Sequence, residues 1–188
     1  MRKREFLATG LATVFAAACT TTGSSASGDS SAKRSSVDAS VDSALSKLYG
    51  QVPGSRELAA RAKGVLVFPS VVSAGLGIGG SYGQGALRVG GRTDGYYSTT
   101  AASVGLLAGA DSKAVYILFL TQDALDKFRA SRGWTAGADA SVTMLKSGAS
   151  AAMDTQTAQQ AVVGYALSNA GLMANLSLDG TKVSKLDL

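Results

Sequence analysis

The sequence predicts an α+β fold: a strongly curved, mainly antiparallel β-sheet or barrel of about eight strands, with two or three helices. Three observations support this prediction. Apolar residues alternate with small or polar ones, or form short unbroken runs, through much of residues 64–145, as strands do. The links between these segments are short and rich in turn-forming residues, which favours antiparallel neighbours. Helical spacing of apolar residues is confined to short segments before and between them.

Residues 1–18 are expected to be a removable leader. Arg2, Lys3 and Arg4 form a positive start, and an apolar stretch of about 13 residues follows, too short for a bilayer that needs about 20. The stretch ends in Ala-Ala-Ala before Cys19, which resembles the cleavage box of bacterial lipoproteins. In that class the cysteine thiol is diacylated and the peptide is cut before it. An ordinary signal peptide cut at Ala-x-Ala is the alternative.

Residues 19–36 are predicted to be a disordered tether, because they are small, polar and without periodicity. Cys19 is the single cysteine, so no intramolecular disulfide competes for its thiol. Thr20 stands where an aspartate usually signals retention in the inner membrane. We therefore expect lipid anchoring in the cell envelope, at the outer membrane and facing the periplasm if the cell is Gram-negative.

The folded domain is expected to span residues 37–188, beginning with a helix. Val37, Val41, Ala44, Leu45 and Leu48 share one helical face, and Gly50 and Pro53 end the helix. A second short helix is predicted over residues 56–63, with Ser55 as its N-cap and Gly64 past its end. Arg56 and Lys63 share a face of this helix. That face is either an ordinary solvated surface or a basic rim for anionic lipid headgroups.

Strands are predicted over most of the remaining chain. The expected segments are 65–68, closed by Pro69; a pair of strands in the glycine-rich stretch 74–91; 96–100; 103–109; 114–120 after a turn at 111–113; 137–145; 164–178; and an edge strand in the last residues. A helix capped by Thr121 interrupts them, with Leu125 and Phe128 on one side. Residues 147–160 are predicted to form a loop followed by a short helix.

The glycine-rich stretch matches the dinucleotide-binding pattern G-x-G-x-x-G at residues 75–80, with Asp94 downstream. Such a loop must open a helix whose N-terminus receives the pyrophosphate, and the Ser-Tyr-Gly-Gln-Gly that follows does not start one. We therefore expect no nucleotide cofactor. The glycines instead indicate bulges, sharp bends or close approach of another backbone or a ligand.

The composition argues against an enzyme and against nucleic-acid binding. Histidine is absent and the chain holds one cysteine, which excludes His–Cys metal sites and His-dependent nucleophiles. We expect no metal site; a Lys63–Ser70 dyad is the catalytic alternative. The leader holds three of the 18 basic residues and one of the 13 acidic ones, so the rest carries 15 against 12, a net charge of +3. That excess is too small to indicate a nucleic-acid partner.

Several segments in order resemble the SYLF domain family over residues 41–188. They are residues 52–53 (VP), 62–68 (AKGVLVF), 75–80 (GLGIGG), 94–98 (DGYYS) and 165–180 (YALSNAGLMANLSLDG). The resemblance implies a lipid-binding module: eukaryotic members bind phosphoinositides and some bind actin, whereas bacterial members are secreted proteins or lipoproteins. Two positions depart from the family pattern, Tyr97 in place of tryptophan and Ala170 in place of lysine.

The expected function is a membrane-tethered envelope lipoprotein whose SYLF-like domain binds anionic phospholipid. Lys63 is the candidate lipid-binding residue that matches the family; Arg56, Arg61, Arg88 and Arg92 are candidates from charge alone. The alternative is a non-enzymatic structural or interaction module of the envelope, with a protein partner.

Overall fold

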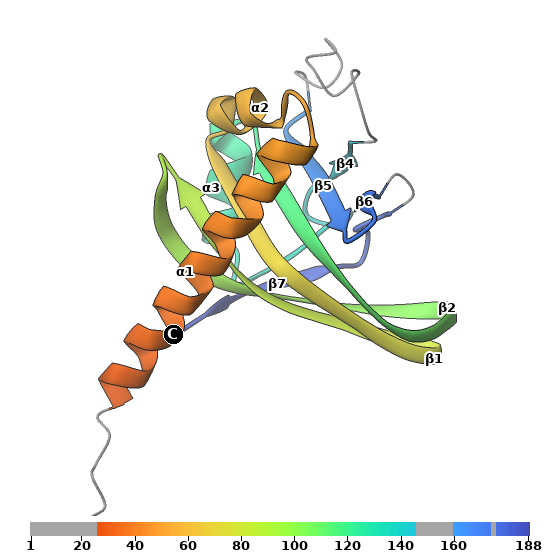
Figure 1. Cartoon of the computed structure of the whole chain (residues 1–188). Helices are drawn as coiled ribbons and strands as arrows, with labels where there is room; N and C mark the ends of the chain where they lie inside the picture. The colour runs from red at the N-terminus through yellow and green to blue at the C-terminus, as the bar shows by residue number, and fades with distance from the viewer. Residues whose placement is uncertain (1–25, 146–159, 174–175) are drawn as a thin grey trace, which may run out of the picture.

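The computed structural model describes residues 26–145, 160–173 and 176–188. Within these ranges three helices, α1 (Ala26–Gln51), α2 (Ser55–Arg61) and α3 (Gln122–Ala130), pack on one curled half-barrel sheet (Figure 1). Seven strands of the described residues form this sheet, in the order β3-β7-β2-β5-β4, with β1 added on β2 and β6 on β5. Every pair is antiparallel except β4–β5. The predicted fold class is confirmed.

Two long strands dominate the sheet. β1 (Gly64–Val89) and β2 (Arg92–Phe119) pair along their whole length, from Val89 opposite Arg92 to Gly64 opposite Phe119. Gly90 and Gly91 join them with φ angles of 57° and 79°, the left-handed values that a two-residue hairpin turn requires. We call this pair the ribbon.

The ribbon replaces the shorter strands predicted from the sequence. The predicted turn at 111–113 is wrong, because these residues lie inside β2 and pair with residues 71–73. Pro69 does not close β1 either. It lies at a register shift between Phe68 and Val71, where a missing N–H breaks no ladder hydrogen bond.

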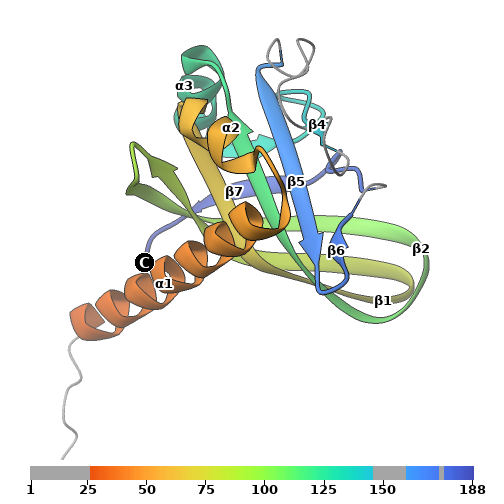
Figure 2. The same cartoon turned by 45° about the horizontal axis from the view of Figure 1, so that its top comes forward.

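The glycine-rich part of β1 folds the ribbon back on itself. A Cβ on Gly75 would lie 2.3 Å from the Cα of Gly79, so the chain turns sharply there. Beyond this bend, a Cβ on Gly85 would lie 1.9 Å from the carbonyl oxygen of Val67. The glycines thus mark a bend and a close backbone approach, as the sequence predicted. They belong to one folded strand, however, and not to a pair. Figure 2 shows the folded end projecting away from the helices, beyond β5 and β6.

The ribbon is buried on both faces where the helices cover it. Val65 and Val67 pack in one apolar cluster with Val41 and Leu48 of α1. Leu66 and Phe68 pack in a second cluster, under α3, together with Phe119, Phe128 and Trp134. The ring of Phe128 lies 4.8 Å from that of Phe119 and 5.7 Å from that of Trp134, measured between centroids. Burial on both faces explains why these strands read as unbroken apolar runs.

Helix α1 begins at Ala26 rather than near Val37. The structure therefore corrects the predicted tether over residues 26–36, which are helical; residues 1–25, with Cys19 and the leader, lie outside the described residues. The extension is polar, its residues 31–36 are exposed, and Asp29 and Lys33 form an i,i+4 ion pair at 3.2 Å. Once the docked half of the helix has formed, adding further residues to it costs little free energy. The sequence did not indicate this extension, because its residues have no apolar periodicity.

Of the two N-caps predicted for the other helices, one is confirmed and one is wrong. Thr121 accepts a hydrogen bond from the N–H of Ala124 and caps α3, as predicted. Ser55 is not the N-cap of α2: Gly54 takes that place, and the Ser55 hydroxyl donates instead to the carbonyl of Val52 at 2.6 Å. No helix in the described part of the chain has the length and apolar character to span a bilayer.

The C-terminal strands are shorter than predicted. They are β3 (Gly133–Thr135), β4 (Thr143–Met144), β5 (Val162–Ser168), β6 (Gly171–Leu172) and β7 (Lys182–Leu186). The predicted strand 164–178 breaks after Ser168, where Gly171 (φ 113°) turns the chain back. β7 lies between β2 and β3, not at an edge. The segment predicted over residues 147–160 lies, apart from Gln160, outside the described residues.

Candidate functional site

Three of the predicted lipid-binding residues lie at one end of the molecule. Arg56 and Arg61 are exposed on α2, and Lys63 is exposed just after it. The Lys63 N–H donates to the carbonyl of Phe119 at 2.8 Å, which fixes the start of β1. The Arg56 guanidinium lies 4.8 Å from the ring centroid of Tyr49 on α1. These cations are exposed on α2 and directly after it.

Arg88 is built into the structure. Its side chain is only 13% exposed and donates to the Asp42 carboxylate at 2.7 Å and to the Thr93 hydroxyl. Its charge also lies 3.4 Å from the Asp38 carboxylate, which accepts hydrogen bonds from Thr93 and Tyr96. Arg88 thus joins α1 to the ribbon with its charge compensated. Arg92 is exposed beside the hairpin turn.

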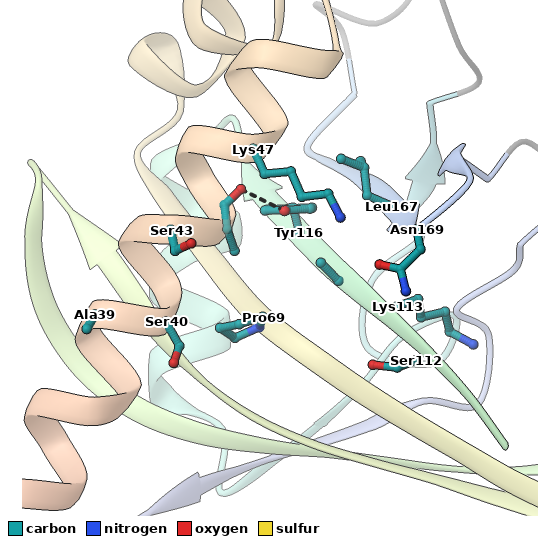
Figure 3. A pocket seen from close by; sticks show the side chains of 12 residues that line it. Ala39, Ser40, Ser43, Lys47, Pro69, Ser112, Lys113, Tyr116, Leu167 and Asn169 are labelled. Atoms are coloured by element: carbon teal, nitrogen blue, oxygen red, sulfur yellow. Dashed lines mark hydrogen bonds between the residues drawn. The ribbon is translucent and has the colours of Figure 1, made fainter.

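A separate hollow of about 460 Å³ lies between α1 and the ribbon (Figure 3). Lys47 extends over it from α1, and Lys113 lies on the opposite side on β2, near Asn169 of the β5–β6 turn, with its ammonium directed away from Lys47. Three serines complete its polar lining: Ser40, Ser43 and Ser112. We call this cavity the lysine hollow.

The charged residues that line the lysine hollow are both basic. None of its lining residues is acidic, and neither ammonium has an ion-pair partner among the described residues. Lys113 also lines a second cavity, together with Ser73, Asp111 and Asp179. Lys113 Nζ lies 3.4 Å from the hydroxyl of Ser73. The Lys47 ammonium and the hydroxyls of Ser40, Ser43 and Ser112, with Lys113 at the edge of the hollow, suit an anion that presents several oxygen atoms, such as a phosphate.

The floor of the hollow is neutral and fixed. The Tyr116 hydroxyl donates to the carbonyl of Ala44 at 2.8 Å, which clamps α1 to β2 beneath the lysines. Burial raises the pKa of Tyr116 to about 12, so the phenol adds no negative charge at neutral pH. The two lysines therefore set the electrostatic character of the site.

The sequence could have revealed half of this site. Ser40, Ser43 and Lys47 follow one another at spacings of three and four, which places them on one face of a helix. Lys113 could not be found in this way, because the residues around it are typical of a turn. Its position over the hollow depends on the continuity of β2 through residues 111–113.

An apolar groove of about 720 Å³ adjoins the hollow and shares Ser40 and Pro69 with it. Val37, Val72 and Tyr82 line the groove, and none of its lining residues is charged. A basic hollow next to an uncharged groove presents two chemically different surfaces side by side.

The catalytic alternative from the sequence has no geometric support. Ser70 bonds to the hydroxyl of Ser112 at 2.9 Å. Lys63 lies at the other end of the same extended segment, on the order of 20 Å away by strand geometry. The two residues are not brought together.

The fold and site define a half-barrel domain with a basic hollow beside an apolar groove. A family model described as Ysc84, Las17-binding protein actin regulator, matches residues 100–187. This part of the chain is similar to the Ysc84/SYLF domain family. The matched region contains Lys113 and Asn169 of the hollow but not α1. No curated protein matches the chain.

Proposed function

We propose that this protein is a lipid-anchored envelope protein whose SYLF domain binds anionic phospholipid, with the headgroup phosphate in the lysine hollow. The observation that carries the proposal is the pair Lys47 and Lys113, which both line one cavity that has no acidic lining residue. The adjoining uncharged groove supports it further, because a phospholipid needs an apolar surface next to its phosphate. Each lysine near an anionic membrane contributes about 1 kcal/mol.

The anchoring part of the proposal rests on the leader and Cys19. The mature chain should begin at a diacylated Cys19, and the domain should face the periplasm from the outer membrane if the cell is Gram-negative. Mass spectrometry of the membrane-extracted protein tests this. A Cys19→Ser chain that still fractionates with membranes after high-salt washing would contradict anchoring by that residue.

Liposome co-sedimentation tests lipid binding. Residues 20–188, which contain every described residue, should bind vesicles that contain an anionic phospholipid more tightly than neutral ones, and salt should weaken binding. Reversing both charges, Lys47→Glu with Lys113→Glu, should weaken binding at least tenfold. The matched control is Lys182→Glu with Lys185→Glu, which changes the net charge equally at exposed positions of β7.

A second double variant separates the two basic surfaces. If the hollow binds the phosphate, Arg61→Glu with Lys63→Glu should weaken binding no more than the β7 control does. The hollow would be the wrong site if the Lys47/Lys113 variant binds like the control while the Arg61/Lys63 variant loses binding. That result would place the headgroup on the outer surface of α2.

A further inference from the structure

The bend of the ribbon exposes large apolar side chains. Within the described residues, the exposed large hydrophobic side chains are Val72, Ile78 and Tyr82, with 49%, 77% and 49% of their surface accessible. All three belong to β1: Val72 and Tyr82 flank the sharp bend at residues 75–79, and Ile78 lies within it. A soluble surface rarely concentrates its exposed hydrophobic residues on one projecting element.

The same element lacks charge. No charged residue occurs in β1 between Gly64 and Leu87, nor in β2 between Gly95 and Ala110. Edge ribbons that face water normally carry charged residues, which prevent aggregation. Most of the backbone of the bend is paired across the ribbon, with Gly77 opposite Gly105 and Ile78 opposite Val104, although the register shifts between Leu76 and Gly77. Such pairing lowers the cost of moving peptide groups into an apolar medium.

The bend, the groove and the lysines follow one another in space. Figures 1 and 2 show the bend as the part of the sheet farthest from α2 and α3. Val72 and Tyr82 line the apolar groove, which meets the lysine hollow at Ser40 and Pro69. The Tyr82 hydroxyl accepts a hydrogen bond from Gln84 at 2.8 Å, and an aromatic ring with a polar tip suits a membrane interface. The exposed apolar bend, the apolar groove and the lysine hollow therefore follow one another. Acyl chains, interface and phosphates follow one another in the same order in a bilayer.

We propose that the ribbon bend inserts into the headgroup–acyl boundary of the membrane whose phosphate occupies the lysine hollow. Ile78, which lies within the bend and is the most exposed of the three, enters deepest, and Val72 and Tyr82 follow. The insertion is interfacial, to a depth on the order of 5–10 Å, and does not span the bilayer. The inference rests on the proposed phospholipid binding and adds to it a surface, a direction and a depth.

Depth-dependent fluorescence quenching tests this insertion. Residues 20–188 lack cysteine, so Ile78→Cys carries a single environment-sensitive fluorophore, and Ala130→Cys, exposed on α3, is the control. With vesicles of neutral and anionic phospholipid that carry acyl-chain spin labels, the fluorophore at position 78 should shift to the blue and be quenched. The fluorophore at position 130 should show neither effect. Co-sedimentation of the same samples reports binding independently.

The outcomes separate the two proposals. Vesicle binding without quenching at position 78 overturns insertion and leaves the hollow intact; absence of vesicle binding overturns both. Ile78→Asp should weaken vesicle binding at least tenfold but leave binding of a monomeric short-chain anionic phospholipid unchanged. Lys47→Glu with Lys113→Glu should weaken both. If Ile78→Asp instead converts a dimer into a monomer without affecting vesicle binding, a second copy of the chain covers the bend, and insertion is wrong.

Discussion

Tyr116 and Tyr165 are both fully buried, yet their hydroxyls differ. Tyr116 donates to the carbonyl of Ala44, whereas the Tyr165 hydroxyl has no partner among the described residues. At neutral pH, Tyr116→Phe should therefore cost roughly 1 kcal/mol of unfolding free energy. Tyr165→Phe should cost nothing or stabilise, because it removes a buried unpaired polar atom.

The same two tyrosines predict a loss of stability at alkaline pH. Burial raises the pKa of each to about 12, from 10.0 for an ordinary tyrosine. Above pH 10 the unfolded chain loses these protons while the folded chain keeps them. The free energy of unfolding should thus be insensitive to these groups below pH 10 and fall by up to about 1.4 kcal/mol per pH unit for each tyrosine between pH 10 and 12.

Urea unfolding at several pH values measures this slope. Replacing both tyrosines by phenylalanine should flatten the curve between pH 10 and 12. An unchanged slope in the double variant would show that other groups, such as Tyr97, dominate the alkaline transition; burial also raises the pKa of Tyr97.

At the scale of elements, the attachment of α1 to the ribbon depends on Arg88. Arg88→Met should lower the free energy of unfolding by roughly 2 kcal/mol, because it removes hydrogen bonds to a charged group and leaves the Asp38 carboxylate without its cation. Vesicle binding should change little. The control Arg92→Met, at an exposed position, should stay within about 0.5 kcal/mol. Urea unfolding and co-sedimentation measure the two effects separately.

A different result would support the interpretation that Arg88 binds lipid, which was drawn from its charge alone. If Arg88→Met leaves the free energy of unfolding unchanged and abolishes vesicle binding, Arg88 contacts lipid, as its charge suggested.

The helices and strands differ in how well the sequence pattern predicted their bounds. The docked half of α1 was predictable because Val41, Ala44 and Leu48 repeat with helical spacing. Its extension through residues 26–36 was not, because an exposed polar helix has no apolar period to detect. Strands β1 and β2 were predicted as fragments, because Pro69 and residues 111–113 are the residue types of turns. Inside a long ribbon a bulge and cross-strand pairing accommodate them.

At the scale of the molecule, the curved α+β fold was predictable from strand alternation and short links. The doubling back of the ribbon was not. The sequence predicted that another backbone comes close to glycines in this stretch, as it does at Gly75, Gly83 and Gly85. A glycine in the sequence does not, however, indicate which segment approaches it. The lysine hollow was missed for the same reason: it joins α1 to β2 across a distance in sequence that no local pattern encodes.

The Gly90–Gly91 turn has a consequence for the order of folding. Pairing between β1 and β2 can start at Val89 and Arg92 and extend residue by residue from the turn. Strand β7, in contrast, pairs with residues 96–100, from which α3 and the strands β3 to β6 separate it in the chain. Local pairs cost less chain entropy and form earlier. The ribbon should therefore assemble first and dock β5 and β7 afterwards.

Two matched glycines test this order. Gly91 and Gly180 have φ angles of 79° and 78°, and a Cβ added at either position would meet no atom within 4 Å. Alanine should cost about 1 kcal/mol at either site. In stopped-flow experiments Gly91→Ala should slow refolding about fivefold, and Gly180→Ala should mainly speed unfolding. Equal slowing of refolding by both variants would contradict this sequence of events.

If the ribbon forms first, the edges of β2 that β5 and β7 later cover remain unpaired for a time. The stretch of β2 opposite β5, Ala114 to Phe119, is apolar throughout. Aggregation during refolding should then begin at this edge and not at the ribbon bend, whose strands are already paired.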